Sequence, residues 1–288
     1  MVYKICRKNN RENSKFINGS KSQQLKKFDK FEAIVKNLNV AIVSIGLIYL
    51  FVPWTHWISK SLQNRNQESF NGLNFQLFAS ANEFISGIRF HHVNCSVKGY
   101  RREKELNVAP LHCGTMVSDM IIDAHEALKL RDLVKISIQS IGYSRKNYPE
   151  SLNIKRVRLY EIFVRGERKG FFNESHFEII KKVSEIVKRA VSLTFGLPEQ
   201  KLFFAPISEA TRFKSVTEFQ EFRHVDKVRA PTLVVTSIIW LSTSGDHFTG
   251  GELEFLTDSP ILLEPKLGRF AAWTSSYENP HAVREMKD

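Results

Sequence analysis

His224 and Asp226, which are separated by one residue in the stretch EFRHVDKV, could bind a metal ion. On an extended segment, residues i and i+2 project from the same face, so this imidazole and this carboxylate could reach one ion. A third ligand further along the chain would complete a facial triad of two histidines and one carboxylate. Such a triad leaves three positions of an octahedral Fe(II) open for a co-substrate and O2.

Two later histidines could supply the third ligand. His247 lies in STSGDHFTGGEL, a turn-like run between strands, where a solvent-exposed histidine is the simpler interpretation. His281 lies in YENPHAVREM, at the start of a predicted strand, and is the better candidate. Nine histidines are spread over 288 residues, so one His-x-Asp pair can arise by chance. Spacing alone therefore leaves two interpretations open, a metal site or polar residues at the start of strands.

The candidate ligands fall in a region whose sequence is typical of short strands. From Leu202 onward, stretches such as APTLVVTSIIWLS, GELEFL and GRFAAWTSS are rich in β-branched or alternating residues and are separated by glycine and proline. No helix is predicted between them, which favours an antiparallel sandwich or barrel.

Two helices are predicted before this β region, so the fold class is α+β. Residues 116–134, MVSDMIIDAHEALKLRDLV, have helical spacing of apolar residues. A clearer helix runs from Ser175 to Gly196, where Ser175 and Glu178 form a capping-box pattern and one apolar stripe predicts a core face. Gly196 and Pro198 end this helix.

Several motifs in residues 200–288 occur together and in a fixed order. They are the His224-x-Asp226 pair, the turn and strand from Gly250 to Leu253, the step from Pro265 to Arg269, and the small or polar run from Thr274 to Asn279 before His281. In this order they resemble the double-stranded β-helix, or jelly-roll, core of the Fe(II)- and 2-oxoglutarate-dependent oxygenases of the prolyl 4-hydroxylase type. The upstream half of the chain also resembles a single-pass membrane member of that family.

The resemblance implies a dioxygenase whose iron ligands are His224, Asp226 and His281. It also implies Fe(II) and ascorbate as cofactors, and 2-oxoglutarate as a co-substrate that is converted to succinate while a C–H bond of the substrate is hydroxylated. The protein would supply geometry and a water-poor pocket, while the metal carries the demanding chemistry. A secretory-pathway substrate is expected, either a protein side chain or a small molecule.

The sequence departs from the family pattern at its carboxyl end. Family members hold the remote carboxylate of 2-oxoglutarate with a lysine or arginine about ten residues after the distal histidine, a position near 291 that lies beyond Asp288. Arg284 is too near His281, and Lys287 would lie on a frayed end. We also expect the C-terminal strand of the jelly roll to be missing, which would leave an unpaired sheet edge. A non-catalytic, truncated interaction module is therefore the alternative function.

Charge and hydropathy predict a membrane anchor. Residues 1–39 hold ten Lys or Arg and three acidic residues, and residues 40–58, VAIVSIGLIYLFVPWTHWI, contain no Lys, Arg, Asp or Glu. Such a segment nearly spans a bilayer, and basic flanking residues favour the cytosolic side. We expect a single-pass type II protein of the endoplasmic reticulum or Golgi with a luminal catalytic domain. A nucleic-acid-binding role is disfavoured because the excess charge lies beside an apolar span. The less favoured interpretation of residues 40–58 is a buried core helix.

Features expected of a luminal domain follow the span. Asn94 and Asn173 begin glycosylation acceptor patterns, although Asn18 on the opposite side does so as well. Cys95 and Cys113 could form a disulfide in an oxidising lumen or remain two buried thiols. His91, His92 and His112 near these cysteines could suggest zinc, but no CxxC spacing supports such a site.

These features divide the chain into five predicted segments. They are a basic cytosolic tail (1–39), a transmembrane signal anchor (40–58), a polar stem (59–90), a helical support region (91–199) and a truncated oxygenase core (200–288).

Overall fold

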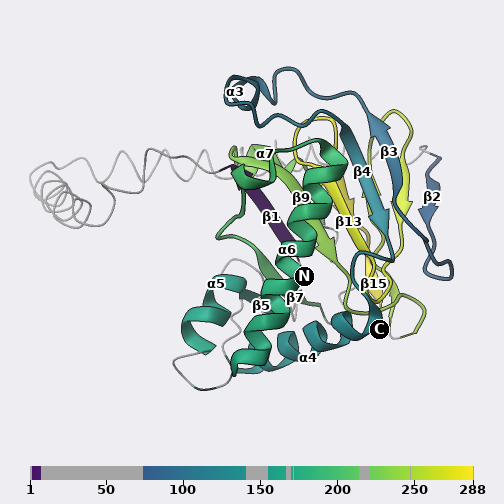
Figure 1. The fold of residues 1–288 in the computed structure, drawn as a ribbon. Helices are drawn as coiled ribbons and strands as arrows, with labels where there is room; N and C mark the ends of the chain where they lie inside the picture. The colour runs from purple at the N-terminus through teal and green to yellow at the C-terminus, as the bar shows by residue number, and fades with distance from the viewer. Residues whose placement is uncertain are drawn as a thin grey trace, which may run out of the picture. The chain divides into compact units, whose positions relative to one another are not determined.

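The computed structural model describes residues 2–7, 74–140, 155–166, 170, 172–213, 221–246 and 248–287. Apart from Asn74, these residues fall in one compact unit, made of residues 1–8 and 75–288. Its described elements form two large β-sheets, a separate two-stranded pair and a layer of helices (Figure 1). The fold is mixed α and β, as expected from the sequence.

The larger sheet is antiparallel throughout. Its strands lie in the order β3 (Arg89–Val93), β4 (Cys113–Ser118), β13 (Phe270–Thr274), β9 (Leu233–Ile239), β1 (Val2–Arg7), β7 (Glu209–Arg212) and β5 (Lys155–Arg158). A short strand, β6 (Leu202–Phe204), also pairs with β1. The neighbouring strands β3, β4, β13, β9 and β1 can be followed in Figure 1.

The smaller sheet carries two of the three candidate ligands. Its order is β2 (Gln76–Ala79), β12 (Ile261–Leu263), β11 (Leu253–Phe255), β14 (His281–Val283) and β8 (Glu221–His224). All its pairs are antiparallel except β2 with β12. A separate short pair joins β10 (Thr249–Gly250) to β15 (Met286–Lys287). Gly250 permits this approach because a Cβ on it would lie 2.1 Å from the carbonyl oxygen of Glu285.

The two sheets face each other across an apolar core. Ala271 and Trp273 of the larger sheet pack there with Phe255 and Leu263 of the smaller one. Two facing, mainly antiparallel sheets with this connectivity form the expected jelly-roll sandwich. The metal-binding candidates lie at the β8–β14 end of the smaller sheet.

A helical layer covers the other face of the larger sheet (Figure 1). It consists mainly of α4 (Ala124–Ser140) and α6 (Glu174–Phe195), and Leu130, Val183 and Val187 contribute to its core. The remaining short elements are α3 (Arg101–Glu105), α5 (Leu159–Glu161), α7 (Asp226–Arg229), a π-helical turn (Ile162–Gly166) and a 3₁₀ turn (Glu199–Lys201).

Both predicted helices have different beginnings in the structure. The one expected from residue 116 begins at Ala124, because residues 113–118 form β4, whose residues are all buried. The capping box of α6 is formed by Asn173 and His176 rather than by Ser175 and Glu178. Gly196 ends α6 in the left-handed conformation, as the sequence predicted.

The structure also corrects the predicted ends of the folded domain. Residues 2–7 were assigned to a cytosolic tail, but they form β1 inside the larger sheet. The expected unpaired edge is absent from this part of the sheet, because β1 pairs with β9 on one side and with β6 and β7 on the other. Lys287, expected on a frayed end, lies in β15.

The predicted stem and support region are likewise partly folded into the sheets. The stem was expected to reach residue 90, yet β2 pairs with β12, and Ala79 and Ile85 are buried. The region 91–199 was expected to be helical but also contributes β4 and β5 to the larger sheet.

Among the residues that the structure describes, no helix combines the length and the hydropathy needed to cross a bilayer. The predicted span, residues 40–58, lies outside the described residues, as does His247.

Candidate metal centre

Strand pairing brings the predicted metal ligands together. His224 ends β8, His281 begins β14, and the two residues are directly opposite each other in the antiparallel register. Opposite residues project from the same face of a sheet, so both imidazoles point the same way. Their ring centroids lie 4.4 Å apart. Asp226 follows two residues after His224, at the first position of α7.

The three side chains form a compact and shielded set of donor atoms. Asp226 Oδ1 lies 3.7 Å from His224 Nε2, and Asp226 Oδ2 lies 3.5 Å from His281 Nε2. One ligand atom from each residue can be chosen so that all three lie within 4.8 Å of one another. The side chains are 13%, 2% and 5% exposed for His224, Asp226 and His281 respectively. This is a set of atoms that one ion could bridge.

Hydrogen bonds fix the orientation of two of these ligands. His281 Nδ1 lies 3.0 Å from the carbonyl oxygen of Asn279, which accepts its proton and leaves Nε2 as the basic nitrogen facing Asp226. Asp226 Oδ2 accepts hydrogen bonds from Thr236 Oγ1 at 2.7 Å and from Trp273 Nε1 at 3.2 Å. Such partners hold metal ligands in position and set their basicity.

The donor set fits a divalent iron better than the other common metals. Two imidazoles and one carboxylate on one side of an ion are the facial triad of non-haem Fe(II) oxygenases, whereas structural zinc is usually held by four protein ligands. The rings of Trp273 and Phe255 pack against His281, with centroids 4.9 and 5.7 Å away. These rings form an apolar wall beside the ligands, so the geometry suits a metal that reacts away from bulk water.

A buried ion pair supports the loop that carries Asp226. Lys227 Nζ lies 3.0 Å from Glu103 Oε1 and 5.0 Å from the ring centroid of Tyr100, and it donates to the carbonyl oxygen of Leu233. Tyr100 in turn donates to Glu278 Oε1 at 2.9 Å. Burial, together with the neighbouring Glu278 carboxylate, raises the pKa of Tyr100 well above its usual range. The side chains around α3 therefore fix α7 next to the metal ligands.

Sequence reasoning missed the residues that support the ligands. Thr236, Trp273 and Lys227 lie in strands or short helices whose spacing gives no sign of their partners. Asn279 belongs to the predicted small or polar run, but it acts through its backbone carbonyl, which no side-chain motif reveals.

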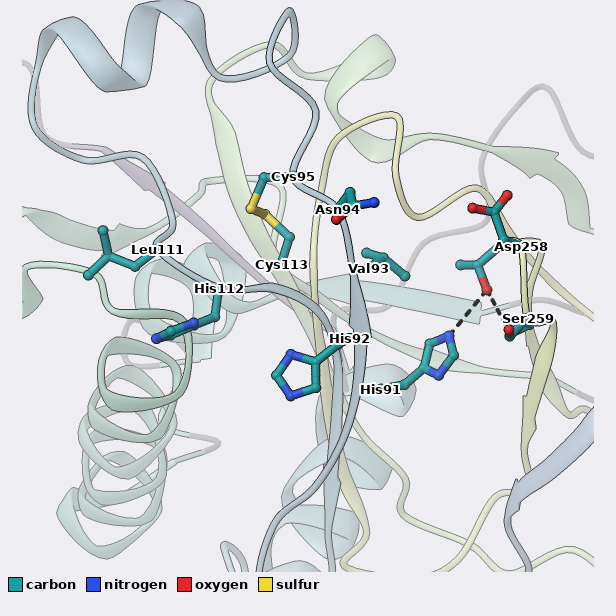
Figure 2. Close-up of a pocket in the computed structure, with 11 residues that line it drawn as sticks. His91, His92, Val93, Asn94, Cys95, Leu111, His112, Cys113, Asp258 and Ser259 are labelled. Atoms are coloured by element: carbon teal, nitrogen blue, oxygen red, sulfur yellow. Dashed lines mark hydrogen bonds between the residues drawn. A yellow bond between two sulfur atoms is a disulfide. The ribbon is translucent and has the colours of Figure 1, made fainter.

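The upstream cysteines and histidines form a disulfide beside a surface pocket rather than a metal site. Cys95 and Cys113 are joined by a disulfide, with a Cα–Cα distance of 5.1 Å, beside a surface pocket (Figure 2). In Figure 2 the rings of His91, His92 and His112 are spread along this pocket rather than converging on one point. Burial, and secondarily the neighbouring His92, lowers the pKa of His91. Among the described residues, the set of His224, Asp226 and His281 is the one metal-competent group of three or more such side chains.

Both predicted glycosylation sites are exposed. Asn94 lies directly before Cys95 in the loop that follows β3. Asn173 caps α6, where its side-chain oxygen accepts from the backbone N–H of His176. Their glycosylation stays a prediction.

Comparison with known proteins identifies the family. Residues 211–288, which include all three candidate ligands, match the model of the 2OG-Fe(II) oxygenase superfamily. The chain carries a 2OG-Fe(II) oxygenase domain. The family resemblance seen in the sequence is therefore confirmed, and so is the expected class of enzyme, a dioxygenase.

Relatives extend this similarity beyond the oxygenase domain. The chain is 27% identical to the 2-oxoglutarate and iron-dependent oxygenase domain-containing protein 3 of Rattus norvegicus over 262 residues, covering 85% of this chain and 79% of the relative. It is 27% identical to the protein of that name from Homo sapiens over 227 residues, covering 73% and 70% of the two chains. Among solved structures, a Trichoplax adhaerens prolyl hydroxylase bound to a peptide of a hypoxia inducible factor gives a TM-score of 0.40. It is 16% identical and covers 66% of this chain and 87% of that one.

Proposed function

We propose that this protein is an Fe(II)- and 2-oxoglutarate-dependent hydroxylase that acts on a protein side chain in the secretory pathway. The observation that carries the catalytic part of the proposal is the buried set of His224, Asp226 and His281, whose ligand atoms lie within 4.8 Å of one another. The family gives the type of reaction.

In this proposal the metal ligands and the residues that hydrogen-bond to them have separate roles. Fe(II), when bound with 2-oxoglutarate and O2, would couple decarboxylation of the co-substrate to succinate and CO2 with insertion of one oxygen atom into a substrate C–H bond. His281 offers Nε2 because Asn279 holds the proton on Nδ1. Thr236 and Trp273 hold the Asp226 carboxylate by donating to Oδ2. The apolar core between the two sheets limits access of water to these ligands.

The secretory location is supported by the disulfide and by the exposed acceptor asparagines. A Cys95–Cys113 disulfide persists in oxidising compartments such as the lumen of the endoplasmic reticulum. Asn94 and Asn173 are both accessible to glycosylation. The apolar residues 40–58 would hold the protein at the membrane of the endoplasmic reticulum or Golgi.

The pairing of β1 limits how residues 40–58 can meet the membrane. A single crossing there would place residues 2–7 and 233–239 on opposite sides, although these residues are hydrogen-bonded as β1 and β9. The proposed topology therefore differs from the type II arrangement that the charges predict. In it, residues 40–58 anchor the chain while β1 and the oxygenase core both remain in the lumen.

Succinate formation tests the proposed reaction. The full chain would be incubated with Fe(II), 2-oxoglutarate and ascorbate, beside a His224→Ala, Asp226→Ala double variant and a His92→Ala control. His92 is exposed and outside the metal-competent set. We expect turnover in the wild type and the control and none in the double variant. An inactive wild type that still folds would favour the non-catalytic interaction module.

A further inference from the structure

A groove in the helical layer takes no part in the metal centre. It lies between the amino-terminal half of α6 and a second wall made by α5, the π-helical turn and the loop between β6 and β7 (Figure 1). Its volume is about 780 Å³, which falls in the range of roughly 300 to 1,000 Å³ that is usual for ligand pockets.

The groove and the metal centre are on opposite faces of the larger sheet. Ile180 and Leu159, which are buried where they line the groove, belong to the core beneath the helices. Trp273 and Phe255, which pack against the metal ligand His281, belong to the core between the two sheets. The reaction at the metal therefore does not account for the groove.

Aromatic rings that are open to solvent form part of its walls. Phe163 and Phe177 stack with ring centroids 5.2 Å apart and an interplanar angle of 21°. Tyr160 is 63% exposed and Phe163 is 40% exposed, and both line the groove. Large apolar side chains are more often buried, and a group of exposed ones marks an interaction site. These rings indicate a surface that another apolar group covers.

A row of charged side chains follows α6 along one side of the groove. Its members are all exposed, line the groove and have the spacing i, i+4, i+7 and i+11, which places them on one face of the helix. They are Glu174, Glu178, Lys181 and Glu185. Three carboxylates and one ammonium group give this side a negative charge, although the formal net charge of the chain is +12.

The carboxylates of this row are available to a partner. None of the three forms an ion pair or a hydrogen bond with another residue that the structure describes. An acidic residue in the first turn stabilises a helix through its dipole, which accounts for Glu174. This effect ends within the first turn, so it does not account for Glu178 or Glu185.

The shape and charge of the groove match an amphipathic helix. From Glu174 to Glu185 the acidic row is about 16 Å long, at about 1.5 Å per residue. A helix can lay one apolar face into such an elongated groove, with anchors at helical spacing. Lysine or arginine on the adjoining face of that helix would then be opposite the acidic row, where opposite charges favour binding.

Two other occupants fit this charge pattern less well. Two copies of the chain that met through the same groove would bring two acidic rows into one interface, where like charges repel. The anionic headgroups of a membrane would be repelled in the same way.

We propose that this groove binds a basic amphipathic helix of a partner protein. Apolar side chains of the helix pack against Tyr160, Phe163 and Phe177, while its lysine or arginine side chains pair with Glu178 and Glu185. The inference is independent of the proposed hydroxylase function, because the groove shares no residue with the metal centre.

Two labelled peptides test the inference directly with the full chain. Both have about 14 residues, enough to form a helix, and both carry leucine along one face. The rest of the surface carries lysine in one peptide and glutamate in the other. We expect fluorescence anisotropy to show the lysine peptide binding at least about 10-fold more tightly than the glutamate peptide.

Two variants separate the apolar contribution from the charge. Phe163→Ser should bind the lysine peptide about 10-fold more weakly, because it removes an aromatic wall. Glu178→Lys should weaken that peptide about 3- to 10-fold and strengthen the glutamate peptide. The matched controls Phe84→Ser and Glu199→Lys change an exposed ring and an exposed carboxylate outside the groove, and should bind both peptides like the wild type.

Several results would overturn the inference. One is a wild type that binds neither peptide or binds both equally, and another is equal weakening in Phe163→Ser and Phe84→Ser. Sedimentation that shows a dimer of the wild type, dissociated by Phe163→Ser, would identify a second copy as the occupant. Weaker binding of phosphatidylserine vesicles by Phe163→Ser than by Phe84→Ser would instead identify a lipid surface.

Discussion

At the scale of single residues, the metal centre depends on groups that never touch the metal. The carboxylate of Asp226 is almost completely buried and accepts hydrogen bonds on Oδ2 from Thr236 and Trp273. Asn279 selects the tautomer of His281. These contacts restrict the ligands to one arrangement before an ion binds, which reduces the entropy lost on binding.

Removing the Thr236 hydroxyl should weaken metal binding without unfolding the protein. In Thr236→Val the shape is kept, but Asp226 Oδ2 loses its shortest hydrogen bond in the centre. We expect the affinity for Fe(II), or for Mn(II) as a redox-stable probe, to fall about 10- to 100-fold. Metal titration followed by equilibrium dialysis would measure the change.

Thr115→Val provides the matched control for this experiment. Thr115 is also fully buried in the larger sheet, but its hydroxyl makes no hydrogen bond to another described residue. Its loss should leave metal affinity unchanged. Equal weakening in both variants would mean that packing, rather than the hydrogen bond to Asp226, controls the site.

The sequence allowed the ligands to be predicted but not their supports. His224, Asp226 and His281 stand in a spacing and context that point to a metal. The roles of Thr236 and Trp273 depend on the register between β9 and β13, in which Trp273 is opposite Thr236. Register is set by long-range pairing, so no local pattern around either residue reveals its partner.

At the scale of elements, one buried arginine joins several loops at one end of the sandwich. Arg269, which is fully buried, donates to both carboxylate oxygens of Asp119 at the end of β4. It also donates to the backbone carbonyls of Ser80, Glu83 and Glu264. The Pro-x-x-Gly-Arg step in the sequence is therefore a structural brace, and sequence reasoning gave it only a place in the family pattern.

The carboxylates around this brace should make stability sensitive to acid. A hydrogen bond from Arg89, and further the Ser80 N–H and the charges of Arg89 and Arg269, outweigh burial and lower the pKa of Glu83 from 4.5 to about 2. For Asp119, burial raises the pKa, but the Arg269 hydrogen bond and other favourable contacts outweigh it and lower the pKa overall. A lowered folded-state pKa contributes stability above the unfolded value, and this stability is lost as the pH falls through the folded value.

We therefore expect the wild type to lose stability as the pH falls from about 5 to about 2. Glu83→Gln should show a smaller loss over that range, because the substituted side chain no longer titrates. Urea unfolding midpoints at neutral and acidic pH would measure both slopes. An unchanged slope in Glu83→Gln would show that Glu83 does not contribute to the acid sensitivity.

The helix predicted from residue 116 was wrong in its first residues, because a strand that is buried on both faces lacks the alternation of apolar and polar residues that marks a strand. Residues 113–118 lie between the two cores, so every position of β4 is buried and no polar alternation marks it as a strand. The apolar residues after Met116 then fit a helical spacing that the structure adopts only from Ala124. Long amphipathic helices such as α6 were predictable because one face is polar.

At the scale of the whole molecule, β1 brings the amino-terminal residues of the chain into the sheet of the oxygenase core. The basic charge of residues 1–39 favours the cytosol, but residues 2–7 of this segment are paired in the sheet of the oxygenase core. The sequence could not predict this pairing, because β1 and β9 are separated by more than two hundred residues and six residues carry little strand signal. The basic charge predicts a cytosolic amino terminus, whereas the pairing of β1 with β9 predicts an amino terminus on the same side of the membrane as the oxygenase core.

Glycosylation of Asn18 distinguishes these two topologies. Asn18-Gly19-Ser20 lies between β1 and the apolar segment, whereas Asn94 and Asn173 lie in or beside the folded core. If residues 40–58 cross the membrane once, Asn18 is cytosolic and stays unmodified while the other two asparagines meet the luminal glycosylation machinery. If β1 and β9 are on the same side, all three acceptor sites are luminal.

We expect Asn18 to be glycosylated together with Asn94, because β1 paired in the sheet of a luminal core keeps the segment after it in the lumen as well. The full chain would be expressed in a secretory-competent cell, and enzymatic removal of glycans would be followed by gel mobility in Asn18→Gln, Asn94→Gln and Asn173→Gln variants. Glycans on Asn94 but not on Asn18 would establish the single crossing and separate β1 from β9. A chain without glycans at any of the three would instead contradict the luminal location.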